Sequence, residues 1–167
     1  ALSRFYAGSE RGRHGPGSVV GATWMTREDR EHEIRDYVAY LDALDRAQRA
    51  ALPAPPPDVT VLGFSQGVAT AARWTVLGAM RPRRLVLWGD FIPPDLDLAR
   101  AREAWAATEV VLVRGKEDPV LRDARLAEAE AGRLEGAGLA PRVVSYERGH
   151  EIHEPTLLAL AGAVGPR

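Results

Sequence analysis

Residues 63–67 read Gly-Phe-Ser-Gln-Gly, a G-x-S-x-G motif with Ser65 at its centre. In this motif the serine lies on a sharp turn between a strand and a helix, and its hydroxyl oxygen attacks a carbonyl carbon. Residues 60–64 are β-branched and apolar, and residues 68–80 are apolar enough for a buried helix. We expect a side chain at Gly63 or Gly67 to clash with so tight a turn. The context predicts that Ser65 is a catalytic nucleophile, and the alternative is a serine in a structural turn.

A serine nucleophile needs a general base, and the base needs a carboxylate that orients it. The expected order along the chain is serine, acid, histidine. Asp118 follows an apolar segment at 110–113, and His150 follows another at 142–146. We therefore predict Asp118 as the acid and His150 as the base. The backbone N–H of Gln66 is the predicted oxyanion donor.

Other titratable residues compete for these roles. Asp90 follows the segment at 84–88 and is the main alternative acid, while Glu117 is a third candidate that we expect to face solvent. His153 competes with His150 but lies where the last helix should begin. Of the remaining histidines, His32 is expected on a polar helix face and His14 in a loop.

Strand-like and helix-like segments alternate along the chain and would position these residues. Apolar residues at helical spacing predict a first helix from a cap at Thr26 to about Ala50. Four strands are expected at 60–64, 84–88, 110–113 and 142–146, and later helices at 68–80, 96–107, 120–135 and 155–164. Uniformly apolar strands that each precede a helix are typical of a parallel sheet covered on both faces. The predicted class is α/β, and its catalytic candidates all follow the carboxyl ends of strands.

The composition is that of one globular domain of 167 residues. A net charge of −1 gives no argument for a nucleic-acid partner, and no apolar run reaches the ~18 residues of a membrane span. The absence of cysteine excludes disulfides and thiolate chemistry. The sequence contains no pair of histidines at metal-binding spacing and no phosphate-binding loop, so we expect no metal and no cofactor.

Three motifs together resemble the phospholipase/carboxylesterase family of α/β-hydrolases, which includes acyl-protein thioesterases and small bacterial serine esterases. They are the pentapeptide at 63–67, the acid turn at 115–119 and Gly-His-Glu-Ile at 149–152. The resemblance covers most of the chain from about residue 20. It implies cleavage of carboxylic esters or thioesters without a cofactor, by Ser65, Asp118 and His150. More weakly, it implies that Phe91 and Ile92 line the acyl pocket.

The first residues depart from the family pattern. Members begin with several strands, one of which ends in a His-Gly-Gly-like loop that supplies a second oxyanion donor. We expect instead a loop over 1–25 ahead of a core at 26–167, within a single α/β-hydrolase domain, 1–167, that is amino-terminally incomplete. An exposed sheet edge would then favour a homodimer.

The leading hypothesis is a cytoplasmic serine carboxylesterase with a small-molecule ester substrate. A thioesterase or lysophospholipase with the same residues is an alternative. A non-catalytic, hydrolase-like binding domain is another.

Overall fold

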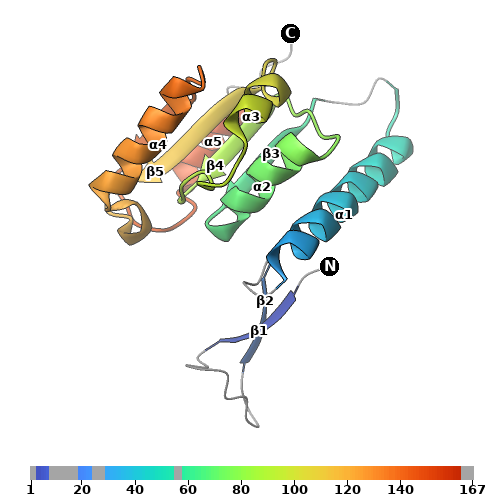
Figure 1. Cartoon of the computed structure of the whole chain (residues 1–167), viewed down its shortest axis with the longest axis horizontal. Coiled ribbons are helices and arrows are strands. Elements are labelled where there is room, and N and C mark those ends of the chain that lie inside the picture. Colours follow the sequence, from blue (N-terminus) through green and yellow to red (C-terminus); the bar gives the residue numbers. More distant parts are fainter. Residues whose placement is uncertain (1–2, 8–18, 24–28, 55–57, 163–167) are drawn as a thin grey trace.

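The computed structural model describes the backbone of residues 3–7 and 19–23, and residues 29–54 and 58–162 in full (Figure 1). Four parallel strands form the main sheet in the order β3-β4-β5-β6. Their bounds are β3 Thr60–Phe64, β4 Arg84–Trp88, β5 Glu109–Gly115 and β6 Arg142–Tyr146. The predicted strands are confirmed, and β5 is longer than expected.

Helices cover both faces of the sheet. On one face lie α2 (Gln66–Leu77), α3 (Leu98–Ala104) and α4 (Ala124–Gly136), and on the other lies α5 (Glu154–Gly162) (Figure 1). The β4 side chains divide between two apolar clusters, Leu85 and Leu87 in one and Val86 and Trp88 in the other. This two-sided burial explains why β4 is uniformly apolar.

The long helix α1 (Arg30–Ala51) packs against α2. Asp42 of α1 accepts hydrogen bonds from the Trp74 indole N–H at 2.8 Å and from the Ala79 amide at 3.0 Å. The predicted cap Thr26 lies outside the described residues, and the N-cap of α1 is Asp29. No helix in the described part of the chain is long and apolar enough to cross a membrane.

Aspartate caps shift two helix boundaries from their predicted positions. Asp97 accepts a hydrogen bond from the Arg100 amide, so α3 begins later than expected. The segment predicted as one helix over 120–135 is divided into the 3-10 helix η1 (Pro119–Leu121) and α4. The reason is a second cap, because the Asp123 side chain accepts the Arg125 amide hydrogen bond at 2.9 Å.

The expectation of a loop over 1–25 is wrong for two segments. Strands β1 (Ser3–Ala7) and β2 (Val19–Thr23) pair antiparallel, with Ser3 opposite Thr23, in a sheet separate from the four-stranded one. Their aromatic and β-branched residues favour extended backbone. Figure 1 shows this hairpin beyond the N-terminal end of α1.

Candidate active site

Ser65 occupies a strained turn between β3 and α2. Its φ of 53° and ψ of −125° make it the only non-glycine residue of the described chain with a positive φ. Its amide donates to the Trp88 carbonyl at 2.9 Å, and its carbonyl accepts from the Val68 amide at 2.8 Å. These bonds hold a conformation that costs an L-residue on the order of 1–3 kcal/mol. The turn therefore fixes where the Ser65 hydroxyl lies.

Only one of the two motif glycines occupies a position where a side chain would clash. A Cβ on Gly63 would lie 2.3 Å from the Gly67 carbonyl oxygen, which no side chain tolerates. A Cβ on Gly67 would meet no described atom within 4 Å, so the expectation of a clash there is wrong. The reason is that the carbonyl of Gly67, and not its Cβ position, faces Gly63.

The two loops that follow β5 and β6 lie side by side. The Lys116 amide donates to the Tyr146 carbonyl at 2.9 Å, and the Glu117 amide donates to the Arg148 carbonyl at 3.1 Å. A Cβ on Gly115 would lie 2.4 Å from the Arg148 carbonyl oxygen, so only glycine permits this approach. The approach brings Asp118 and His150 together.

A chain of hydrogen bonds joins Ser65, His150 and Asp118. His150 Nε2 lies 2.9 Å from Ser65 Oγ, and His150 Nδ1 lies 2.9 Å from Asp118 Oδ2. The Asp118 side chain is fully buried, and its Oδ1 accepts the Val120 amide hydrogen bond at 2.9 Å. With Nδ1–H donating to Asp118, the Nε2 lone pair faces the Ser65 hydroxyl. This arrangement suits proton transfer from the hydroxyl to the imidazole.

Two aromatic residues that the sequence analysis missed support the His150 loop. The buried Trp88 indole N–H donates to the Tyr146 hydroxyl at 3.0 Å. That hydroxyl lies 2.7 Å from the Glu151 carbonyl oxygen and 2.9 Å from the Gly149 carbonyl oxygen, so its proton is directed at the loop. The available signal was an aromatic residue at the last position of both β4 and β6.

Asp90, the alternative acid, lies near His150 without bonding to it. Burial raises the pKa of Asp90, and the only hydrogen bond that its carboxylate accepts in the described chain comes from the Phe91 amide at 2.8 Å. Glu117 is exposed. Of the three candidate acids, therefore, Asp118 is the one that is hydrogen-bonded to His150.

The other histidines have other neighbours. The His153 ring stacks on Tyr146 with centroids 5.0 Å apart, and its Nδ1 lies 2.9 Å from the Thr156 hydroxyl oxygen. His32 is exposed and pairs with Asp29, whereas His14 lies outside the described residues. No group of three potential metal ligands occurs in the described residues.

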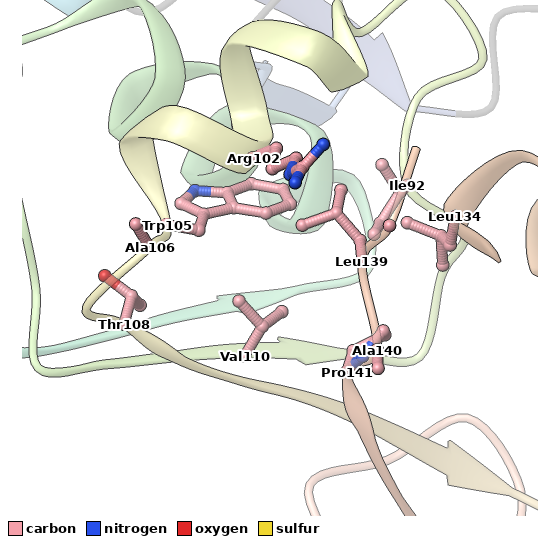
Figure 2. Close-up of a pocket in the computed structure, with 11 residues that line it drawn as sticks. Ile92, Arg102, Trp105, Ala106, Thr108, Val110, Leu134, Leu139, Ala140 and Pro141 are labelled. Carbon is pink, nitrogen blue, oxygen red and sulfur yellow. The ribbon is translucent and has the colours of Figure 1, made fainter. Parts of the chain in front are cut away.

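The two predicted acyl-pocket residues differ in placement. Phe91 is partly exposed, with the Arg114 guanidinium 5.3 Å from its ring centroid. Ile92 is 2% exposed, packs in the core and lines a cavity to which Ser65, Asp118 and His150 do not contribute (Figure 2). Contact of either residue with an acyl group stays a prediction.

Gln66 is the first residue of α2. Its amide therefore belongs to the first helical turn, beside Ser65 and at the positive end of the helix dipole. This is the position in which an N–H group can stabilise negative charge that develops near the Ser65 hydroxyl.

Comparison with known proteins finds similar solved structures. No family model and no curated protein matches the chain. Arabidopsis thaliana SOBER1 has a TM-score of 0.67 at 18% identity, over 87% of this chain and 73% of that one. Zea mays acyl-protein thioesterase 2 has a TM-score of 0.62 at 18% identity, over 89% of this chain and 75% of that one. A carboxylesterase from Mesorhizobium loti has a TM-score of 0.58 at 19% identity, over 89% of this chain and 76% of that one.

At these identities the likeness concerns the fold. The parallel sheet, the interleaved helices and the sharp turn at Ser65 agree with the fold that the sequence resemblance implied. The chain has the α/β-hydrolase fold of the esterases and thioesterases that it matches.

Proposed function

We propose that this protein is a serine hydrolase that cleaves carboxylic esters through an acyl-enzyme intermediate. The observation that carries the proposal is the pair of 2.9 Å hydrogen bonds from His150, one to Ser65 and one to Asp118. Three side chains from three separate loops meet in the arrangement that activates a serine.

In the proposed mechanism Ser65 Oγ attacks the acyl carbon while His150 Nε2 accepts its proton. Asp118 keeps the Nδ1–H tautomer and stabilises the imidazolium that forms. The Gln66 N–H donates to the oxyanion of the tetrahedral intermediate. The intermediate collapses when His150 returns the proton to the leaving alcohol. A water molecule deprotonated by the same histidine then releases the carboxylic acid and restores Ser65.

A thioester substrate is the second candidate for the same residues. The structural likeness to Zea mays acyl-protein thioesterase 2 favours it. The chemistry differs only in the leaving group, a thiol in place of an alcohol. Turnover of acyl thioesters and matched oxygen esters, compared as kcat/KM, would rank the two substrate classes.

Fluorophosphonate labelling with intact-mass detection tests the proposal directly. We expect one adduct on the wild-type protein and none on Ser65→Ala, because only an activated serine reacts. Ser145→Ala is a matched control, since Ser145 is exposed on β6 and should leave labelling unchanged. A folded wild-type protein that takes up no label would refute the hydrolase proposal and favour a non-catalytic binding domain.

A further inference from the structure

The cavity that Ile92 lines has a volume of about 330 Å³ and lies between α3, α4 and the sheet (Figure 2). Most of the residues that line it are apolar, among them Ile92, Trp105, Val110, Leu134 and Leu139. Trp105 and Leu134 are each 4% exposed and belong to the core. The walls are therefore held in place by the packing of the domain.

Two polar side chains of the wall, those of Trp105 and Thr108, already have hydrogen-bond partners. The Trp105 indole N–H donates to the Thr75 hydroxyl at 2.9 Å, and the Thr108 hydroxyl donates to the Pro82 carbonyl at 2.7 Å. A ligand in this cavity would thus meet apolar side chains together with the exposed polar atoms that remain in the wall.

Arg102 is the exception, because its guanidinium adjoins the cavity without a partner. The side chain is exposed, and within the described residues it makes no hydrogen bond or ion pair. Its Cζ and Nε would lie 3.7 Å from a Cβ on Gly138, another residue of the cavity wall. Figure 2 shows Arg102 above the apolar side chains of Leu139 and Trp105.

We propose that this cavity binds a small monocarboxylate with an apolar body, whose carboxylate pairs with Arg102. A planar guanidinium binds a carboxylate through two parallel hydrogen bonds. An apolar cavity of about 150 Å³ holds benzene, so this volume suits a chain of about eight carbons. The ligand class thus follows from one unpaired cation beside a cavity of this size that is lined mostly by apolar residues.

This site is distinct from the one at Ser65. Thr108 and Pro141, which line the cavity, directly precede β5 and β6 and so lie at the amino ends of those strands. Ser65, Asp118 and His150 follow the carboxyl ends of their strands. In a parallel sheet the amino ends of the strands lie on one side and the carboxyl ends on the other, so these two sets of residues lie at opposite ends of the strands.

The test is a titration of the full chain with sodium octanoate, followed by NMR of the ¹⁵N-labelled tryptophan indoles. We expect the Trp105 resonance, assigned with Trp105→Phe, to shift with octanoate. The Trp88 resonance should stay, because Trp88 packs in the other apolar cluster and serves as an internal control. A Trp105 resonance that does not move at about 10 mM octanoate, a generous concentration for so small a ligand, would refute the site.

The charge is tested with Arg102→Gln and with the matched control Arg100→Gln, another exposed arginine of α3 that does not line the cavity. Octanoate should bind Arg102→Gln roughly two- to fivefold more weakly, as for an exposed ion pair, and Arg100→Gln as it binds the wild type. Octanol, which has no charge, should bind all three proteins alike. Equal octanoate affinity in Arg102→Gln and wild type would overturn the pairing with Arg102.

Discussion

At the scale of single residues, the candidate site depends on close approaches that leave no room for a side chain. Gly63 lies against the Gly67 carbonyl, and Gly115 lies against the Arg148 carbonyl. Each contact positions one part of the Ser65–His150–Asp118 hydrogen-bond chain. Small changes at these glycines should therefore affect both the fold and the reactivity of Ser65.

Gly63→Ala and Gly67→Ala should behave in opposite ways. The first places a Cβ 2.3 Å from a backbone oxygen, so we expect a loss of about 3 kcal/mol in the free energy of unfolding and the loss of fluorophosphonate labelling. The second adds a methyl group in open space within α2, where alanine favours helix by up to ~1 kcal/mol. Urea unfolding measures both changes. Equal stability of the two variants would contradict the steric argument.

Asp118→Asn and Asp90→Asn distinguish the two candidate acids. Because only Asp118 bonds His150 Nδ1, Asp118→Asn should lower kcat by about 10⁴ by favouring the wrong tautomer. Asp90→Asn should keep most of the activity. Ester turnover by both variants decides the assignment, and a larger loss in Asp90→Asn would reverse it.

Asp90→Asn should also change how stability depends on pH. Burial raises the pKa of Asp90 above the ordinary 3.8, so the native state binds this proton more tightly than the unfolded state. The ionised group therefore destabilises the fold increasingly as the pH rises from about 3.8 through the raised pKa. We expect the stability of Asp90→Asn relative to wild type to increase over this range. Urea unfolding at a series of pH values measures it.

At the scale of elements, ion pairs join neighbouring strands at their amino ends, opposite the carboxyl ends that Ser65 follows. The buried Arg84 of β4 lies 2.6 Å from a Glu109 carboxylate oxygen of β5 and donates to the Leu160 carbonyl of α5 at 2.6 Å. Arg142 of β6 lies 3.0 Å from the other Glu109 oxygen. Glu109 thus connects three adjacent strands.

Glu109→Gln should lower stability at neutral pH but not in acid. Burial alone would raise the pKa of Glu109, but hydrogen bonds and charge from Arg84 and Arg142 outweigh it and lower the pKa below the ordinary 4.5. The stabilisation is present above pH 4.5 and is lost as the pH falls through the lowered value. We expect a loss of roughly 1 kcal/mol at pH 7, since the partly exposed carboxylate is screened by solvent.

Urea unfolding of Glu109→Gln at pH 7 and at pH 3 measures this dependence. Glu103→Gln is the control, because Glu103 is exposed and forms no ion pair among the described residues. A deficit for Glu109→Gln that persists undiminished at pH 3 would contradict the assignment to charge.

At the scale of the whole molecule, the four-stranded sheet ends at β3 and β6 within the described residues. The Leu62 side chain on β3 is 41% exposed. An edge strand with unpaired backbone groups and an exposed leucine is a template for pairing with another copy of the chain. This edge is the one at which the sequence led us to expect a homodimer.

Leu62→Lys should therefore weaken self-association. A lysine on an edge strand opposes pairing by charge repulsion and by the cost of burying an ammonium group. Size-exclusion chromatography with light scattering should find the wild-type protein dimeric and the variant monomeric. Leu158→Lys, at a 61% exposed leucine of α5, should remain dimeric. A monomeric wild-type protein would refute the expectation.

The sequence by itself determined the order of the elements and singled out the residues on which the proposed chemistry depends. The bounds of β3, β4 and β6 follow from short apolar runs, and the turn at Ser65 follows from a five-residue motif. These signals are local, because strand propensity, helix caps and turn residues act within a few positions. For that reason Ser65, Asp118 and His150 could be named before the fold was known.

Tertiary structure alone decided the relations between distant segments. It selected Asp118 over Asp90 as the partner of His150, because Gly115 lets the loops after β5 and β6 touch. It paired Ser3–Ala7 with Val19–Thr23 across a glycine-rich stretch that suggested only a loop. It also enclosed the cavity beside Arg102 between α3 and α4. Such contacts join residues far apart in the chain, so no local pattern specifies them.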